Sequence, residues 1–263
     1  MKAKRIKSEK LKNTRDIGGY ATKDGRSVKK AMLIRSGQLS QASDNDLKNL
    51  TENFRLRTII DLRIDAEINE KPDRIPKNVN YIRVPLLDKA YLGITRDEYS
   101  LQSWFNMFTD NSRRPEDIFY DMYDVLVFGE RSKELIHEIF SIFLGDNDAV
   151  LWHCSAGKDR VGIVTMLLLL ALGVDRETII EDYFATNIFS RKEIIKTLIF
   201  APLVIKNRWQ RKCLKILMTV KREYMERLLD KIENNYVDVF DFFEKQYSIS
   251  KDEIISLRNK YLD

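Results

Sequence analysis

Cysteine and histidine are both scarce in this sequence. Its 263 residues include two cysteines, Cys154 and Cys213, and two histidines, His137 and His153. Two cysteines cannot build a disulfide framework, and neither belongs to a Cys-x-x-Cys pair. Because a zinc site needs several such ligands together, the sequence predicts no zinc centre. We therefore expect no metal and no other cofactor.

Glycine, proline and long apolar runs are also few. Ten glycines and five prolines argue against long disordered or low-complexity stretches. The longest uncharged run, 161–174, is too short to span a bilayer and indicates a buried helix. No apolar segment of a secretory signal follows the basic N-terminus, so we expect a cytoplasmic protein. Secretion stays open as an alternative if a signal peptide has been removed.

The charge balance is basic. The formal net charge is +5, and 32% of the residues are charged while 44% are hydrophobic. These fractions are typical of a globular protein. A basic surface favours acidic partners such as phosphorylated molecules, anionic membranes or nucleic acid, and does not choose among them.

Strands alternate with helices along the first two thirds of the chain. This order predicts an α/β sheet with helices on both faces, followed by a helical extension. The predicted strands are 31–35, 57–62, 80–87 and 149–153, and the predicted helices are 43–54, 65–70, 115–144 with a break near Gly129, and 161–172. We interpret residues 1–12 as a solvated basic arm. Residues 13–263 then form one domain, in which 188–263 supply a helical lid and the C-terminal helices.

The stretch AVLWHCSAGKDRVGIVTMLLLL carries the chemistry. A buried strand would deliver Cys154 to the carboxyl edge of the sheet, where open α/β sheets bind ligands. The residues from Ser155 to Arg160 then lead into a helix, whose first N–H groups and dipole attract an anion. Gly157 permits an unusual backbone conformation or a close approach to the ligand. Arg160 can hold two phosphate oxygens with its planar fork.

The same positive field would act on the sulfur of Cys154. It favours the thiolate, which is a strong nucleophile. Attack on phosphorus would give a phosphocysteine that water then hydrolyses, with Arg160 and the loop stabilising the charge. Cys213 lacks this spacing, because Thr219 stands where the arginine would be. The alternatives are a buried structural cysteine, a sulfurtransferase or arsenate reductase, and an idle phosphate-binding module.

The residues His153 to Arg160, HCSAGKDR, resemble the signature of the Cys-based protein tyrosine phosphatase superfamily. The Lys158-Asp159 pair is similar to the PtpB-like group of atypical bacterial phosphatases. That group acts on phosphotyrosine, and some members also act on phosphoserine, phosphothreonine and phosphoinositides. Further segments that resemble motifs of the group are NTRDIGG, LIRSGQLS, IIDLR and ALGVDRETIIEDYFATN, so the likeness extends roughly over residues 11–263.

The resemblance implies a phosphatase-like central sheet with a helical lid, and it assigns roles to the loop. Cys154 would be the nucleophile, Arg160 the phosphate clamp, and His153 a residue that tunes the thiolate from behind. The loop would donate backbone N–H groups from Ser155, Ala156, Gly157, Lys158, Asp159 and Arg160. Asp159 is the first candidate for the general acid, Asp88 the second, and Asp61 a third that is better explained as structural.

Two further features bear on turnover and substrate. Val161 stands where the group usually has a serine or threonine, so we expect slow hydrolysis of the phosphoenzyme, and Thr165 lies one turn later. Lys158 favours a phosphoinositide as an alternative substrate. Residues 191–222 contain ten lysines and arginines and one glutamate among apolar residues. Such a helix can lie on an anionic membrane or form a lid with a solvated face. The expected partners are thus a phosphorylated protein or phosphoinositide and an anionic membrane surface, with no nucleic acid.

Overall fold

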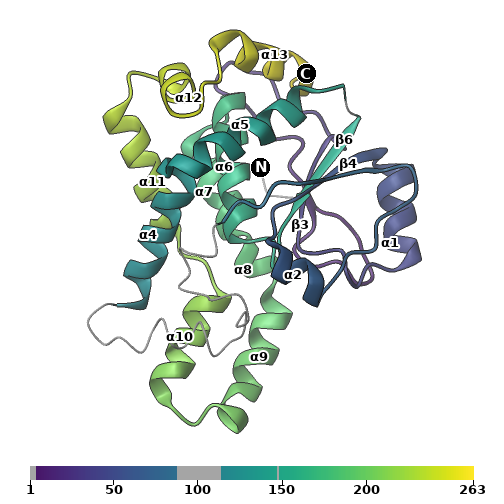
Figure 1. Ribbon diagram of the computed structural model, residues 1–263, viewed down its shortest axis with the longest axis vertical. Coiled ribbons are helices and arrows are strands. Elements are labelled where there is room, and N and C mark those ends of the chain that lie inside the picture. Colours follow the sequence, from purple (N-terminus) through teal and green to yellow (C-terminus); the bar gives the residue numbers. More distant parts are fainter. Residues whose placement is uncertain (1–3, 88–113, 147) are drawn as a thin grey trace.

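The structure, a computed structural model, describes residues 4–87, 114–146 and 148–263. Its sheet has six strands in the order β1-β2-β3-β6-β4-β5 (Figure 1). The strands are β1 (Lys4–Arg5), β2 (Arg15–Asp16), β3 (Leu33–Ser36), β4 (Leu56–Asp61), β5 (Asn80–Arg83) and β6 (Ala149–His153). From β3 to β5 the neighbours are parallel, whereas β1 and β2 are antiparallel. In the register, Leu151 of β6 lies opposite Ile34 and Ile59.

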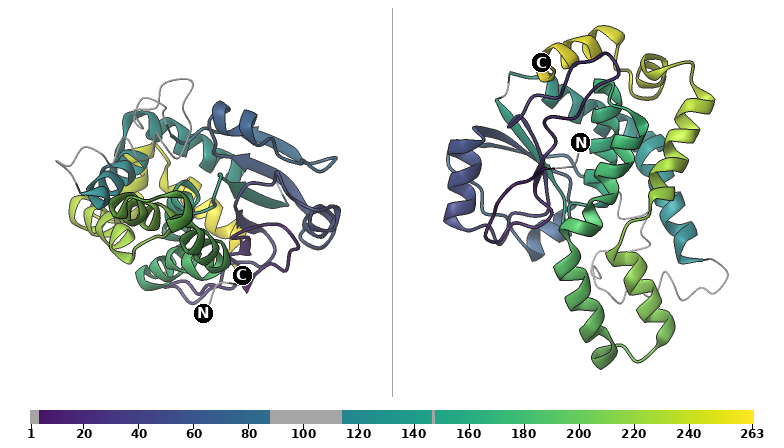
Figure 2. Two further views of the ribbon diagram at one scale, coloured as in Figure 1. Left: turned by 90° about the horizontal axis from the view of Figure 1, so that it is seen from below. Right: turned by 180° about the vertical axis from the view of Figure 1, so that it is seen from behind.

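Helices cover both faces of the sheet (Figure 2). One face carries α1 (Asp44–Lys48) and the π-helical turn η1 (Asn49–Asn53), and α2 (Asp65–Glu70) follows β4. The helices α4 (Pro115–Phe128), α5 (Glu130–Leu144), α6 (Asp159–Leu172), α7 (Arg176–Phe184), α8 (Thr186–Phe189), α9 (Arg191–Val204), α10 (Arg208–Met218), α11 (Arg222–Asn235), α12 (Val239–Tyr247) and α13 (Lys251–Tyr261) form the rest of the described fold. This arrangement confirms the predicted α/β class.

The core forms two clusters because side chains of a strand alternate between the faces of the sheet. Val150 and Trp152 of β6 face the large cluster beneath α5 and α6. Leu151 faces the small cluster, which Leu50 of η1 covers. The central strand β6 is therefore buried on both faces. Cys154, which follows its last residue, is held in a fixed position by this packing.

Most predicted elements agree with the structure. The helices 43–54, 65–70, 115–144 and 161–172 are present, with the break at Gly129 and with Gly173 closing α6 at a φ of +83°. The strand predicted for 80–87 ends at Arg83, two residues before Pro85, which has no N–H for a sheet. The apolar run after residue 160 is buried, as expected for α6. Within the described residues, no helix has the length and apolar character needed to cross a membrane.

The interpretation of a solvated arm is wrong for residues 4–12. β1 pairs with β2, and Ile6 and Leu11 are buried in the small cluster. The partner strand β2 lies within the segment NTRDIGG that follows. Ile6 and Leu11 stand singly among exposed basic residues, and these two apolar side chains suffice to attach the segment to the sheet.

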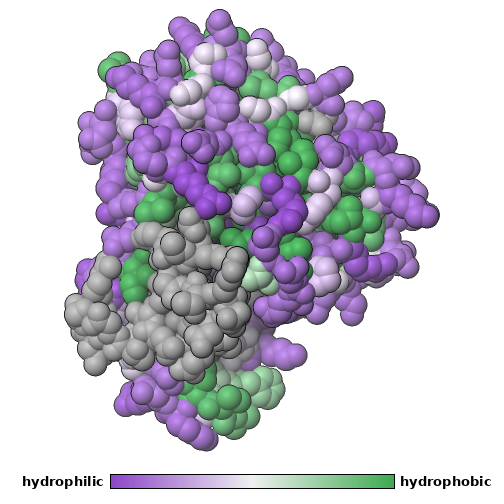
Figure 3. Space-filling model, viewed as in Figure 1, coloured by the Kyte–Doolittle hydropathy of each residue, from purple (hydrophilic) through white to green (hydrophobic). Residues whose placement is uncertain are grey.

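The helices after residue 188 fall into two groups. α11, α12 and α13 pack on the core, where Tyr224, Leu228, Phe243 and Leu257 are buried. α9 and α10 pack on each other and extend away from the sheet (Figure 1). The outer end of this helical hairpin carries apolar surface (Figure 3).

Candidate active site

The predicted nucleophile lies where the central strand ends. β6 runs parallel to both of its neighbours, β3 and β4, so their carboxyl ends share one edge of the sheet. Cys154 follows His153, the last residue of β6, and is almost fully buried. The other thiol, Cys213, is fully buried in α10, and burial raises its pKa. Only Cys154 therefore stands at the ligand-binding edge.

The loop between β6 and α6 has its backbone held from behind. The carbonyl oxygen of Gly157 accepts hydrogen bonds from Asn13 Nδ2 at 2.6 Å and from Arg35 Nη2 at 3.1 Å. Among the residues that the structure describes, the N–H groups of 155–158 donate to no protein acceptor. Successive N–H groups of this kind are the donors that an anion-binding nest uses.

Gly157 is required by the shape of this loop. Its φ is +67°, and a Cβ there would lie 2.5 Å from the carbonyl oxygen of Ser36 and 2.6 Å from the nitrogen of Gly37. An unusual backbone conformation was expected, and it is confirmed. The close neighbour is the end of β3, so the glycine also seats the loop against the sheet.

Arg160 lies in the first turn of α6 and is bound by a carboxylate that the sequence did not reveal. Its Nη1 and Nη2 donate to Oε2 and Oε1 of Glu67, each at 2.6 Å. Nη1 also donates to the carbonyl of Leu62 at 3.2 Å. Glu67 Oε1 accepts from the hydroxyl of Ser155 at 2.5 Å. Glu67 thus holds both the clamp and the loop in place.

The charge of Glu67 follows from its surroundings. Burial raises the pKa of this carboxyl, but the Arg160 guanidinium and the Ser155 hydroxyl outweigh it, and the pKa lies below its usual value. Glu67 therefore remains a carboxylate near neutral pH. The arginine that is expected to grip phosphate is consequently oriented in advance by a negative partner.

Asp159, the first candidate for the general acid, shares a pocket with the thiol. A cavity of about 220 Å³ is lined by Cys154, Asp159 and Arg160 together with apolar residues of α4 and α10. Asp159 Oδ1 accepts from the hydroxyl of Tyr123 at 2.5 Å, and Tyr123 in turn contacts the hydroxyl of Tyr183 at 2.6 Å. Burial, reinforced by Asp159, raises the pKa of Tyr123 well above its usual value, so the tyrosine remains a donor.

Asp88, the second candidate for the general acid, lies outside the described residues. Asp61, the third, is fully buried and binds the guanidinium of Arg63 and the hydroxyl of Tyr81, the latter at 2.6 Å. This agrees with the structural interpretation of Asp61. The choice between Asp159 and Asp88 remains a prediction.

Lys158 joins the loop to the helical hairpin. Its Nζ donates to the carbonyl of Leu217 near the end of α10, and it lies 3.3 Å from Asp159 Oδ2. The ammonium also lies over the ring of Phe119, 5.6 Å from its centroid. In this arrangement the cation is shared between protein groups at the mouth of the pocket.

The residue after Arg160 is Val161, which has no hydroxyl where the PtpB-like group usually has a serine or threonine. Val161 is fully buried in α6. The hydroxyl of Thr165 donates to the carbonyl of Val161 at 2.6 Å and accepts from Trp152 Nε1 at 3.2 Å. Thr165 is thus engaged behind the helix and does not replace the hydroxyl that Val161 lacks.

A buried charge cluster holds the loop from below. Asp182 of α7 binds Arg15 of β2 at 2.9 Å and Arg35 of β3 at 2.5 Å. Burial raises the pKa of Asp182, but the two guanidinium groups overcome it and lower the pKa to about 2. Since Arg35 also binds Gly157, the cluster connects α7 with the loop. The motifs RDIGG, LIRSG and EDYFATN contain these residues, although sequence analysis assigned them no role.

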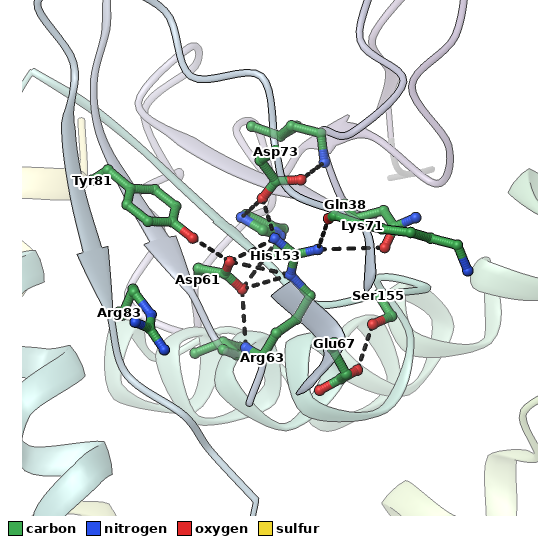
Figure 4. Close-up of polar contacts among 12 residues, drawn as sticks. Gln38, Asp61, Arg63, Glu67, Lys71, Asp73, Tyr81, Arg83, His153 and Ser155 are labelled. Atoms are coloured by element: carbon green, nitrogen blue, oxygen red, sulfur yellow. Dashed lines mark hydrogen bonds and ion pairs between the residues drawn. The ribbon is translucent and has the colours of Figure 1, made fainter. Parts of the chain in front are cut away.

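A second polar cluster surrounds His153 at the back of the site (Figure 4). The ring lies 3.2 Å from Asp73 Oδ2 through Nε2 and 3.8 Å from Asp61 Oδ1 through Nδ1. Burial lowers the pKa of His153 despite these carboxylates, which favours the neutral ring. Ligand atoms of Asp61, Asp73 and His153 lie within 4.8 Å of one another, but Arg63 binds both carboxylates, at 2.8 and 2.5 Å. The guanidinium therefore already occupies both carboxylates and offsets one of their two negative charges.

A wider cavity of about 530 Å³ lies beside the loop. Its lining includes Ser155, Ala156 and Lys158 of the loop, Glu67 of α2, and residues of α9 and α10. Lys10, Lys12 and Lys71 add positive charge to the wall, whereas Glu70 and Glu193 add negative charge. The cavity accordingly offers room for a group larger than a phosphate next to the predicted nucleophile.

The contact of Glu67 with Arg160 was not predicted from the sequence. Glu67 stands three residues after Ile64, the N-cap of α2, and its Oε2 accepts from the N–H of Ile64 at 3.1 Å. Nothing in that local pattern points to Arg160. Glu67 lies at the start of α2, which follows β4, the strand that pairs with β6. This position in the topology is the signal from which a contact with the loop after β6 could have been predicted.

Comparison with known proteins gives one family and distant relatives. The model of the "Tyrosine phosphatase family" matches residues 6–263. A relative from Cupriavidus necator is 28% identical over 180 residues, which are 67% of this chain and 61% of that protein. The triple specificity protein phosphatase PtpB of Mycobacterium tuberculosis is 26% identical over 189 residues, 66% of either chain. The chain therefore spans about three fifths to two thirds of the length of these relatives.

Among solved structures, the Siw14 catalytic core covers 88% of this chain and 95% of its own, at 12% identity and a TM-score of 0.34. A likeness of that size carries no argument by itself. The family match extends over the sheet, the loop from Cys154 to Arg160 and the helices that follow. On this evidence the chain belongs to the tyrosine phosphatase family.

Proposed function

We propose that the protein is a phosphatase that hydrolyses phosphomonoesters, phosphotyrosine among them, through a phosphocysteine at Cys154. The observation that carries this proposal is the common pocket of Cys154, Asp159 and Arg160 at the end of β6. The family match and the free N–H groups of 155–158 support it. These parts would place a nucleophile, a cation and backbone donors around one phosphate.

In the first step, the sulfur of Cys154 attacks phosphorus and the bond from phosphorus to the leaving oxygen breaks. That oxygen takes the proton of Asp159, or of Asp88 as the alternative. Arg160 and the loop N–H groups stabilise the charge on the remaining phosphate oxygens. Glu67 accepts from both Nη1 and Nη2 of Arg160. The guanidinium would therefore need to rotate only slightly to donate to the phosphate as well.

In the second step, water attacks phosphorus, the sulfur leaves as thiolate and inorganic phosphate departs. A proton of the water returns to the carboxylate that acted as acid. Val161 offers no hydroxyl to the departing sulfur, and Thr165 is engaged elsewhere. We therefore infer that this step limits turnover.

The substrate beyond phosphotyrosine is the finer part of the proposal. Phosphoserine and phosphothreonine follow from the likeness to a phosphatase named triple specificity. A phosphoinositide is the second candidate, and the wider cavity favours it because Lys10, Lys12 and Lys71 stand beside Lys158. A phosphate-binding module with weak catalysis is the third, and the buried Val161 is the observation that favours it.

Hydrolysis of an aryl phosphate tests the proposal. We expect activity that vanadate inhibits and that Cys154→Ser abolishes. Cys213→Ser is the matched control, because this second thiol is buried in α10 and should be dispensable for the reaction. Activity that survives Cys154→Ser would refute the phosphocysteine. A panel of phosphopeptides and phosphoinositides with the active protein then ranks the substrates.

A further inference from the structure

The helical hairpin α9–α10 exposes more aliphatic surface than its fold requires. Ile195, Ile199 and Leu203 of α9 recur at helical spacing and are all exposed, Phe200 flanks them, and Ile188 of the preceding α8 is exposed as well. Val204 at the outer end is 83% exposed. Figure 3 shows apolar surface at the lower end of the molecule, where this hairpin lies. Contiguous apolar surface of this kind usually marks a site of interaction.

The apolar stripe is not part of the contact between the two helices. α9 and α10 bury Ile194, Ala201, Cys213, Leu214 and Ile216. The hairpin therefore has its own packed interior, whereas Ile195, Ile199 and Leu203 are exposed, and Phe200 and Val204 line an open groove between α9 and α10. Replacing a residue of the stripe should accordingly leave the hairpin folded.

Basic side chains are frequent in the hairpin that carries this stripe. Residues 191–218 contain eight lysines and arginines and one acidic residue, Glu193. The cations are Arg191, Lys192, Lys196, Lys206, Arg208, Arg211, Lys212 and Lys215. Within the ranges 4–87, 114–146 and 148–263, none of these eight forms an ion pair. A surface that combines aliphatic side chains with cations free of ion pairs is complementary to an anionic lipid bilayer, which has an apolar interior and negatively charged headgroups.

We propose that the α9–α10 hairpin docks on the surface of an anionic lipid bilayer. Leu203, Val204 and the neighbouring aliphatic side chains enter the interface, while the lysines and arginines contact lipid phosphates. Docking is peripheral, since no described helix is suited to cross a membrane. The inference goes beyond the proposed catalysis and does not depend on it.

The geometry connects the docked hairpin with the site. Ser190, Glu193 and Ile194, at the start of α9, line the cavity beside the loop of Cys154. Lys158 of that loop donates to Leu217 of α10. The inner end of the hairpin is thus in contact with the site, whereas the docking residues Leu203 and Val204 lie at the outer end of the 14-residue helix α9.

Vesicle flotation tests the proposal on the full chain. The probes are vesicles of phosphatidylcholine alone and of phosphatidylcholine mixed with phosphatidylserine, each at low and high salt. We expect the protein to float with the anionic vesicles and to be released by salt. Val204→Glu should weaken binding about tenfold, and Lys206→Glu with Arg208→Glu by at least as much. Hydrolysis of a soluble aryl phosphate should be unchanged, since these residues lie outside the catalytic pocket.

Matched controls make the outcome decisive. Val237 is 88% exposed on another part of the surface, so Val237→Glu should bind as the unchanged protein does. Lys48→Glu with Lys77→Glu alters the net charge equally on other exposed residues. Cys154→Ser should float normally, which separates docking from catalysis. The proposal is overturned if anionic vesicles are not bound, or if the controls lose binding equally. It is also overturned if light scattering finds a dimer that Val204→Glu dissociates.

Discussion

Arg160 and Glu67 bind each other through two parallel contacts of 2.6 Å, although 93 residues separate them in the chain. Both side chains are nearly buried, so the pair is shielded from solvent. A planar arginine held by a planar carboxylate has little freedom to rotate. The phosphate clamp of this site is thus positioned before any substrate arrives.

Glu67→Gln should disturb this positioning. We expect kcat to fall roughly 10- to 100-fold, because a guanidinium that is misplaced by a fraction of its length binds the transition state poorly. The free energy of unfolding should fall by about 1–3 kcal/mol, since one charged contact is lost and the other becomes neutral. Glu70→Gln is the control, because the side chain of Glu70 is half-exposed and, among the described residues, its ion pair is with Lys71. Equal effects of both variants on kcat would contradict the positioning role.

Gly157→Ala should abolish most of the activity. The added Cβ would meet Ser36 at 2.5 Å, so the loop would have to move away from β3 and displace its N–H groups. Gly25→Ala separates this clash from backbone strain, because Gly25 has a φ of +87° and no atom within 4 Å of the added Cβ. Both variants should lose about 1 kcal/mol of stability through strain, and only Gly157→Ala should lose vanadate binding, measured by thermal shift.

Val161→Thr should accelerate turnover. The unchanged protein should give a burst of leaving group followed by a slow steady phase, and the variant should show a smaller burst and a faster steady phase. Rapid mixing with an aryl phosphate measures both. Thr165→Val is the control, since its hydroxyl binds Trp152 and the backbone of Val161 and should affect stability alone. A trace that is linear from time zero would refute slow hydrolysis of the phosphoenzyme.

Asp159→Asn should reveal the general acid through the leaving group. We expect a loss of about 100-fold on phenyl phosphate and a much smaller loss on p-nitrophenyl phosphate, whose leaving group barely needs a proton. Tyr123→Phe keeps the carboxyl but removes the hydrogen bond that orients it, so a smaller loss should follow. If Asp88→Asn shows this dependence and Asp159→Asn does not, the acid is Asp88.

Stability should decline in acid through Asp182. Its folded pKa is lowered from 3.8 to about 2, so the stability that this carboxylate contributes is fully present above pH 3.8 and is lost as the pH falls through 2. The contribution is roughly 2 kcal/mol. Asp182→Asn should remove this dependence and destabilise the fold by about 3–5 kcal/mol at neutral pH, since Arg15 and Arg35 lose their common partner. Urea unfolding at neutral pH and near pH 3 measures both effects.

Local patterns predicted the elements that form the site. The strand 149–153, the loop after it and the helix beginning near residue 160 all follow from consecutive residues, because an apolar run, a glycine and a buried helix are near neighbours in the chain. Predictions were weaker where few apolar residues decide the outcome. Ile6 and Leu11 attach a basic segment to the sheet, but they form no periodic pattern from which their burial could be predicted.

The sequence by itself determined the chemical core of this protein, namely a thiol, a glycine and an arginine within one short loop after a buried strand. The spacing of these three residues indicates an anion-binding loop without any contact to distant parts of the chain. The tertiary structure alone decided which groups orient that core: Glu67 on Arg160, Tyr123 on Asp159, and Asp182 beneath Arg15 and Arg35. These partners come from elements far apart in the chain, and only the packing of the sheet against its helices brings their charges into contact.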